Sequence, residues 1–339
     1  MDHDSDETGD GSPASRNRQA VTLPGHRLVM VLGMTQRVGT NHLFDLLLLH
    51  PRLAAPGWMH EDYLILHSDH LVRYAGRVSS QWTPAWGVPR AAGRDLELSL
   101  GRALEEFVLA GVDLESPVPL FSGAPRRGPL GDREWFALTK TPSIRGLRNV
   151  HRLLPSARLV VIVRGGPATV ESAVRSFGGT YESWMRTWAA AASEVVDFFR
   201  SAPPRSVLVR YEDLVRDRAG EMRRVLEALD LPVEEFPFDR VDHLPVRGSS
   251  QTAGVDGPDF SPREPDATFD PLARAGSWDE RLLRRFRWIA GSVVEQLGYR
   301  HLSEEPDPLR ERFTDLRVLI GRGAARLERG VKRRVRRLW

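Results

Sequence analysis

Several basic and hydroxyl residues stand directly after short apolar runs of the chain. The first of these runs, residues 26–33, leads into the polar loop Gly33–Asn41 (GMTQRVGTN) and then into a helical pattern. Where a loop joins a strand to a helix, free backbone N–H groups and the helix dipole attract anions such as phosphate. The loop therefore predicts an anion site that includes Arg37. The alternative is an ordinary loop in which Thr40 or Asn41 caps the helix.

This first loop does not have the spacing of a Walker A loop. A Walker A loop places four residues between its glycines and follows the second glycine with Lys and then Ser or Thr. Here five residues separate Gly33 from Gly39, the dipeptide Thr40-Asn41 follows, and the basic residue Arg37 precedes the second glycine. A phosphate site of a different kind is indicated.

A second apolar run ends in an arginine. Residues 159–163 (LVVIV) are followed by Arg164 and then by a helical pattern that carries Ser172. A guanidinium offers a bidentate fork to a phosphate, and a serine on the helix adds a donor. This pair predicts a second anion contact. A surface salt bridge made by Arg164 is the alternative.

Lys140 is notable because the chain contains almost no lysine. Only Lys140 and Lys332 are lysines among the 48 basic residues. Lys140 follows the apolar run 134–139, at a third predicted strand end. A compact ammonium there could follow the charge that builds on an oxygen as a bond to it breaks. The alternative is a solvated lysine placed there by chance.

The elements that position these residues alternate between strand and helix. Strand-like runs lie at 26–33, 134–139, 158–163 and 206–211, and helical patterns at 43–49, from 167, and at 221–229. This alternation predicts an α/β fold of three layers, in which a central parallel sheet is flanked by helices and the first loop is P-loop-like. Ligands of such folds bind in the crevice at the carboxyl ends of the strands.

The first loop resembles a known nucleotide-binding motif. Arg37-Val38-Gly39-Thr40-Asn41 is similar to the Arg/Lys-Ser-Gly-Thr-Thr/Asn loop with which sulfotransferases hold the 5′-phosphosulfate of 3′-phosphoadenosine 5′-phosphosulfate (PAPS). Val38 replaces the usual Ser, and Gln36 the usual Pro. The backbone donors of the loop do not depend on these side chains, so the resemblance implies that Arg37–Asn41 binds the donor.

Other motifs of the same family follow in order along the chain. Arg164 and Ser172, eight residues apart, resemble its 3′-phosphate motif, and Lys140 resembles the lysine that contacts the transferring group. Residues 209–214 (VRYEDL) resemble a strand end whose tyrosine, here Tyr211, lies near the adenine. Residues 244–250 (LPVRGSS) resemble a second 3′-phosphate contact, which would consist of Arg247, Gly248 and Ser249.

The resemblance implies a sulfotransferase that uses PAPS as donor cosubstrate and a hydroxyl compound as acceptor, either a carbohydrate, a lipid or a secondary metabolite. PAPS carries on the order of four negative charges, which Arg37, Lys140, Arg164 and Arg247 would meet. No HExxH motif, aspartate cluster or Walker B acid is present, so no metal is expected. The alternatives are a P-loop-like small-molecule kinase and a non-catalytic protein that binds nucleotides or polyanions.

The general base is expected among acidic residues. Glu61 and Asp62 occupy the place where tyrosylprotein-type and many bacterial carbohydrate-type sulfotransferases carry an acidic base. Glu61 is the first choice and Asp62 the second, with His67 and His70 next; the alternative is that both acids lie at the surface of a helix start. The catalytic set implied by the resemblance is Arg37, Glu61, Asp62 and Lys140.

The chain divides into three parts by composition. Residues 1–23, acidic and poor in large apolar side chains, are expected to be a disordered arm. Residues 24–302 form the predicted catalytic domain, with an acceptor-side insertion at 76–133. Residues 303–339 form a basic amphipathic tail, in which residues 317–339 carry nine Arg or Lys and one Glu. Such a tail could lie on an anionic membrane or pack on the domain.

Composition excludes several other classes. The 339 residues contain no cysteine, which rules out disulfides, thiolate metal sites and cysteine nucleophiles. No run approaches the roughly 20 apolar residues of a membrane span, and the N-terminus is acidic rather than signal-like. We therefore expect a cytoplasmic protein, peripheral to the membrane if its tail binds there, with no nucleic-acid partner.

Overall fold

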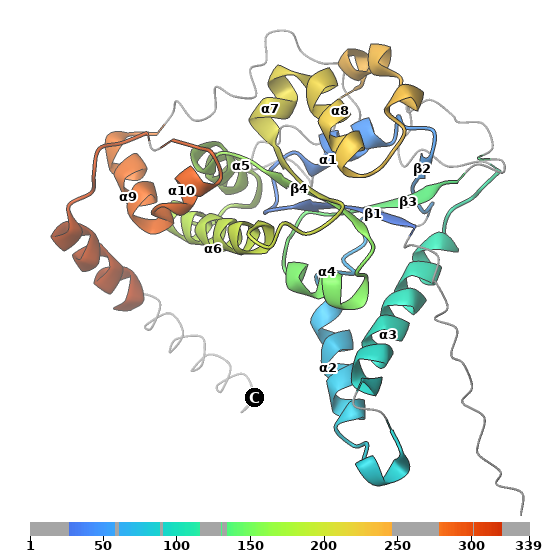
Figure 1. Ribbon diagram of the computed structural model, residues 1–339. Coiled ribbons are helices and arrows are strands. Elements are labelled where there is room, and N and C mark those ends of the chain that lie inside the picture. The colour runs from blue at the N-terminus through green and yellow to red at the C-terminus, as the bar shows by residue number, and fades with distance from the viewer. Residues whose placement is uncertain are drawn as a thin grey trace, which may run out of the picture.

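The computed structural model describes residues 27–57, 61–88, 91–115, 130, 134–245, 278–300 and 302–320. Within them, five strands form one parallel sheet in the order β2-β3-β1-β4-β5 (Figure 1). The strands are β1 (Leu28–Gly33), β2 (Leu53–Ala54), β3 (Phe136–Thr141), β4 (Arg158–Val163) and β5 (Ser206–Arg210). The predicted strand at 134–139 therefore begins and ends two residues later.

Helices occupy both faces of this sheet. The α-helices are α1 (Thr40–Leu47), α2 (Ser68–Ser79), α3 (Ala92–Leu109), α4 (Leu147–Leu153), α5 (Gly166–Phe177), α6 (Tyr181–Phe199), α7 (Tyr211–Arg216), α8 (Arg218–Ala228), α9 (Glu280–Ala290) and α10 (Val293–Gln296). Three short 3₁₀ helices are η1 (Pro84–Trp86), η2 (Val233–Glu235) and η3 (Phe238–His243). A further helix covers residues 308–320.

Alternate residues of the buried strands separate the core into two apolar clusters. In β1, Leu28, Met30 and Leu32 pack with the cluster that includes α4, α5 and α6, whereas Val29 and Val31 pack with α1, α7 and α8. Side chains that alternate across a strand in this way require helices on both faces. Figure 1 shows the two helical layers above and below the sheet. The predicted three-layer α/β fold with a P-loop-like first unit is confirmed.

The register brings the carboxyl ends of the strands to one edge of the sheet. Leu32 pairs with Thr141 of β3, Gly33 with Ile162 of β4, and Val163 with Arg210 of β5. From β1 the chain continues toward β2 on one side of the sheet, whereas from β4 it continues toward β5 on the other side. The loops after β1 and β4 therefore diverge at a topological switch point, which is where open α/β sheets bind ligands.

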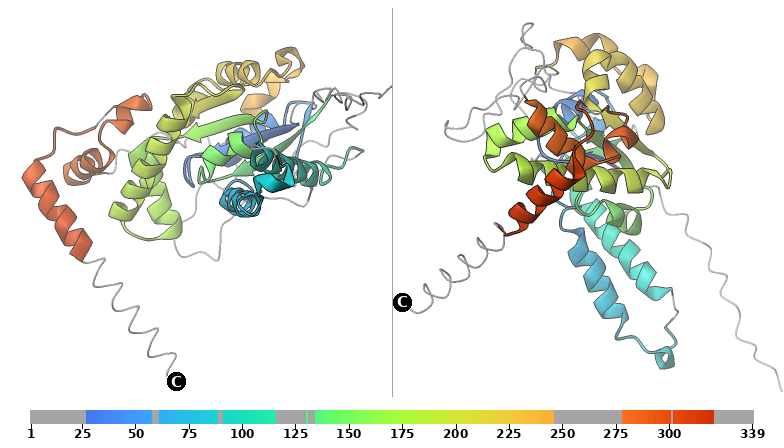
Figure 2. Two further views of the ribbon diagram at one scale, coloured as in Figure 1. Left: turned by 60° about the horizontal axis from the view of Figure 1, so that its bottom comes forward. Right: turned by 90° about the vertical axis from the view of Figure 1, so that its left-hand side faces the viewer.

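Helix α2, which lies mostly before the insertion predicted at 76–133, and helix α3, which lies within it, form an arm. Helices α2 and α3 lie side by side and project from the layer that contains α4 (Figure 2). A turn separates Glu61 and Asp62 from α2, which begins at Ser68. The alternative that placed these two acids at a helix start is therefore wrong.

The arm rests on α4 through a glycine. A Cβ atom on Gly101 of α3 would lie 1.8 Å from the carbonyl oxygen of Leu153, whereas a Cβ on Gly76 of α2 would meet nothing within 4 Å. Both glycines lie inside helices, so a difference between the effects of their alanine substitutions on the free energy of unfolding would come from packing.

We expect Gly101→Ala to lower the free energy of unfolding by about 1–3 kcal/mol, because the methyl group must displace backbone of α4. Gly76→Ala is the matched control and should raise it by about 0.5–1 kcal/mol through helix propensity. Urea denaturation of both variants measures this. Equal effects of the two substitutions would contradict the close approach of α3 to α4.

Candidate active site

The loops after β1 and β4 hold two arginines and a serine together. Arg37 Nε donates a hydrogen bond to Ser172 Oγ of α5 at 3.2 Å. Arg164 Nη1 donates to the main-chain carbonyl of Arg37 at 3.3 Å. Arg164 and Ser172 are both buried. Three residues predicted from two separate motifs are therefore neighbours at the switch point, where they form a cationic cluster with a hydroxyl group.

Tyr211, the first residue of α7, lies against this cluster. The guanidinium carbon of Arg164 lies 4.4 Å from the centre of the Tyr211 ring. A Cβ atom on Gly39 would lie 2.4 Å from the same ring, and Gly39 has a φ of +98°. Glycine is therefore required at position 39 both for the backbone conformation and for contact with Tyr211. The predicted donor-site residues Gly39 and Arg164 thus both lie against the Tyr211 ring.

Helix α1 begins immediately after this glycine. Gly39 is its N-cap residue, and no side chain caps the helix, so the alternative in which Thr40 or Asn41 serves as the cap is wrong. Val38 is fully buried in the apolar cluster beneath α1. Val38, where the family usually has serine, therefore packs in the core. Only its backbone can contact a ligand.

Lys140 stands at the end of β3 with its side chain fully buried. Its Nζ donates a hydrogen bond to Asn41 Oδ1, and it lies 3.7 Å from Glu61 Oε1. The ammonium is also 5.7 Å from the centre of the Phe44 ring. Buried charges require partners of this kind. The alternative of a solvated lysine is therefore wrong. The loop Gly33–Asn41, called the anion loop below, and the predicted base segment Glu61–Asp62 meet at Lys140.

Asp62 has a different environment from Glu61. Its backbone N–H donates to the Lys140 carbonyl at 3.0 Å. Its Oδ1 accepts hydrogen bonds from the Thr141 hydroxyl and from the Leu64 N–H. Burial raises the pKa of the Asp62 carboxyl; the hydroxyls of Thr139 and Thr141 partly oppose this, although Thr139 makes no hydrogen bond of regular geometry. Asp62 therefore attaches the segment that contains Glu61 to β3.

Glu61 is held from a second side by Tyr63, which the sequence did not single out. The Tyr63 hydroxyl donates to Glu61 Oε2, and this hydrogen bond raises the pKa of Tyr63 to about 12. Tyr63 adopts a left-handed φ of +48°, as Arg37 does at +70°. Such backbone costs a non-glycine residue about 1–2 kcal/mol. Two of the five non-glycine residues with a positive φ in the described part of the chain, Arg37 and Tyr63, thus lie at the predicted site.

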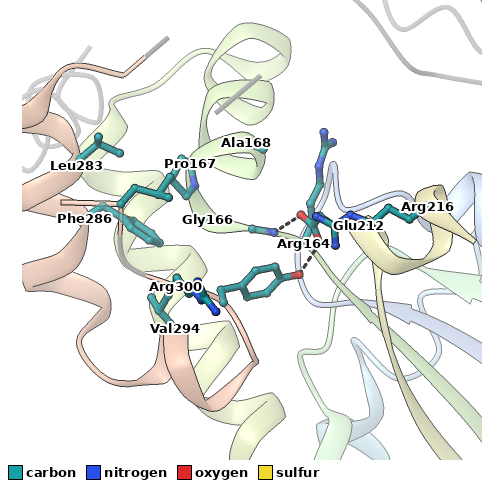
Figure 3. A pocket seen from close by; sticks show the side chains of 13 residues that line it. Arg164, Gly166, Pro167, Ala168, Glu212, Arg216, Leu283, Phe286, Val294 and Arg300 are labelled. Carbon is teal, nitrogen blue, oxygen red and sulfur yellow. Dashed lines mark hydrogen bonds between the residues drawn. The ribbon is translucent and has the colours of Figure 1, made fainter. Parts of the chain in front are cut away.

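Glu212 connects the loop after β4 to the C-terminal helices. Its Oε1 accepts from the Gly165 N–H at 2.9 Å and its Oε2 from the Tyr299 hydroxyl at 2.8 Å (Figure 3). Burial, followed by the charge of Glu212, raises the pKa of Tyr299. These residues border a cavity of about 270 Å³ beside Arg164. Glu212 and Tyr299 therefore fix the backbone that presents Arg164.

The remaining predicted residues do not all fall within the described part of the chain. Arg247, Gly248 and Ser249 lie outside the described residues. His67 and His70 are exposed at the start of α2, with ring centres 6.2 Å apart. Among the described residues, His, Asp and Glu side chains form no group of three that could hold a metal ion. No helix of this part is both long and apolar enough to cross a bilayer.

The chain belongs to the sulfotransferase family, because residues 29–235 match the model of that family. Protein-tyrosine sulfotransferase A of Caenorhabditis elegans is 31% identical over 114 residues, which are 31% of this chain and 30% of that relative. Carbohydrate sulfotransferase 1 of Danio rerio is 26% identical over 202 residues, which are 50% of this chain and 46% of that relative. The matches thus span less than half the length of these two relatives.

Among solved structures, the sulfotransferase domain from the curacin biosynthetic pathway aligns with a TM-score of 0.43 and 16% identity. The alignment covers 84% of this chain and 99% of that domain.

The buried Asp62 carboxyl predicts a pH-dependent stability. Because the pKa of Asp62 is raised in the folded protein, its charged form opposes folding at neutral and alkaline pH. This penalty disappears as the pH falls through the folded pKa toward the unfolded pKa of about 4. We expect Asp62→Asn to raise the free energy of unfolding at pH 8 by about 1–3 kcal/mol, since an amide leaves no unpaired charge there. Denaturation from pH 8 to pH 5 should show this gain shrinking, and a gain that grows toward acid would refute the assignment.

Proposed function

We propose that this protein transfers a sulfuryl group from PAPS to a hydroxyl of a carbohydrate, a lipid or a secondary metabolite. The observation that supports this function most strongly is the meeting of two clusters at one edge of the sheet. The cationic cluster of Arg37, Arg164 and Ser172 suits a phosphate. The neighbouring pair of Lys140 and Glu61 joins a cation with a carboxylate 3.7 Å away.

We assign the 3′-phosphate to Arg164 and Ser172, and the 5′-phosphosulfate to loop Arg37–Asn41 and Lys140. Arg164 is buried against Tyr211, so its charge is weakly screened and its position is fixed. Tyr211, which packs on Gly39, is assigned to the adenine side. Arg247, Gly248 and Ser249, assigned from sequence alone, would add a second 3′-phosphate contact.

Glu61 is the proposed general base. Its side chain is partly exposed and lies beside Lys140, whereas the Asp62 carboxyl is buried and engaged by Thr141 and Leu64. Glu61 takes the proton of the acceptor hydroxyl as the acceptor oxygen bonds to sulfur. The bond from sulfur to the bridging phosphate oxygen breaks, and its electron pair leaves with adenosine 3′,5′-bisphosphate. Lys140 stabilises the charge on that oxygen.

The arm of α2 and α3 is proposed to contribute to the acceptor side. Helix α2 follows the Glu61 segment directly, and buried Ser68 at its start donates to the Ile65 carbonyl at 2.6 Å. The arm therefore continues from the residue that would receive the acceptor proton.

Adenosine 3′,5′-bisphosphate should raise the melting temperature in the presence of EDTA, because the assigned ligands of its two phosphates are protein groups. Arg164→Ala should weaken its binding by about 2–3 kcal/mol, since a charged hydrogen-bond partner is lost. Exposed Arg148 of α4 supplies the matched control, because Arg148→Ala removes the same charge and should bind normally. Thermal-shift titration measures both; stabilisation by ATP with Mg²⁺ alone would instead favour a kinase.

Glu61→Gln should lower kcat by about 10²–10⁴-fold and leave affinity for the bisphosphate nearly unchanged, because glutamine keeps the shape of the side chain but cannot accept the proton. The acceptor for this assay comes from mass-shift screening of extracts with labelled PAPS. Exposed Glu234 provides the control variant Glu234→Gln, with wild-type turnover expected. A larger loss of turnover in Asp62→Asn than in Glu61→Gln would assign the base to Asp62.

A further inference from the structure

The helix at residues 308–320 attaches to the body of the protein through its acidic residues. Buried Arg285 of α9 donates to Glu311 Oε2 at 2.8 Å and to Asp315 Oδ1 at 2.6 Å. Asp315 also accepts from Trp288 Nε1 at 2.9 Å and from Arg186 of α6. Although burial opposes ionisation, these hydrogen bonds lower the pKa of Asp315 to about 2. This face of the helix is therefore fixed to α6 and α9.

The opposite face of the same helix carries an exposed apolar stripe. Leu309, Phe313, Leu316 and Ile320 are 78%, 62%, 52% and 63% exposed. Their spacing of four, three and four residues places them in one row along a helix of 3.6 residues per turn. Leu319, 68% exposed, lies beside the row. Figures 1 and 2 show this helix at the outside of the molecule, next to α9.

The charged residues of the helix are sorted between its two faces. Both acids, Glu311 and Asp315, are turned inward and paired with Arg285. All three arginines, Arg310, Arg312 and Arg317, are exposed. At 100° per residue, Arg310 and Arg317 flank the apolar row on one side and Arg312 flanks it on the other. The outward face therefore presents apolar and cationic groups without an acid.

The sequence that follows continues this pattern. Residues 321–339 contain eight Arg or Lys and one Glu. Leu327, Val331, Val335 and Leu338 continue the apolar spacing of the exposed row. An apolar row between arginines is the composition of a helix that lies in the interface of a membrane, with its apolar side among the acyl chains and its cations at the lipid headgroups.

We propose that the outward face of the helix at 308–320 binds an anionic membrane surface. A second copy of the chain fits this face less well, because it would bring Arg310, Arg312 and Arg317 against the same arginines with no acid to pair them. An anionic lipid surface accepts both the apolar row and the arginines. This inference stands apart from the proposed sulfuryl transfer, since it uses residues of a different face and a different ligand.

The test is cosedimentation of the full-length protein with vesicles. We expect binding to vesicles of phosphatidylcholine with phosphatidylglycerol, weakened by added salt, and much weaker binding to phosphatidylcholine alone. Phe313→Ser/Leu316→Ser should lower the partition coefficient about tenfold or more, because two apolar side chains no longer enter the interface. Arg312→Gln/Arg317→Gln should lower it about fivefold per arginine on anionic vesicles.

The control is Phe107→Ser/Leu114→Ser, which replaces the same two residue types at exposed positions, Phe107 within α3 and Leu114 after it. It should bind vesicles as the wild type does, with circular dichroism and melting temperature confirming that all variants fold. Wild-type binding by Phe313→Ser/Leu316→Ser would overturn the proposal, since the basic tail alone would then account for it. The proposal would also be overturned if the wild type did not bind anionic vesicles but formed a concentration-dependent dimer, and if Phe313→Ser/Leu316→Ser abolished that dimer.

Discussion

The burial of one ammonium group organises the site. Lys140 ends a central strand with its side chain fully buried, and an uncompensated charge there would cost several kcal/mol. Its compensation comes from two other segments: Asn41 at the start of α1 and Glu61 before α2. The Asp62 N–H and the Lys140 carbonyl bind the same segment to β3. One buried cation thus joins the anion loop to the carboxylate proposed as base.

Several neutral groups contact the arginines of the site. Arg37 is bound to a hydroxyl, and Arg164 contacts a carbonyl and an aromatic ring. Glu212 accepts a hydrogen bond from the N–H of Gly165, the residue after Arg164. Arg37 and Arg164 therefore place two positive charges at the edge of the sheet where a polyanionic donor is proposed to bind. Positioning before the ligand arrives reduces the reorganisation that binding requires.

Local patterns predicted much of this arrangement, and contacts between distant segments account for the remainder. The run LVVIV located β4, and the spacing of Arg164 and Ser172 followed from a strand that leads into a helix. Tyr299 contacts Glu212 across 87 residues of sequence, so no local pattern could reveal the pair. Glu61 and Asp62 are adjacent, and their different environments depend on the left-handed turn at Tyr63 and on the Thr141 hydroxyl of β3. Sequence order alone does not determine which carboxyl is buried.

If this edge of the sheet binds the sulfuryl donor as proposed, the donor binds in one orientation, which a crystal structure with adenosine 3′,5′-bisphosphate would reveal. We expect the 5′-phosphate at Lys140 and the backbone N–H groups before α1, the 3′-phosphate at Arg164 and Ser172, and Glu61 facing the vacant side of the 5′-phosphate. A nucleotide bound away from the carboxyl ends of β1 and β4, or bound there with its two phosphates exchanged, would contradict the assignment of every ligand in the site.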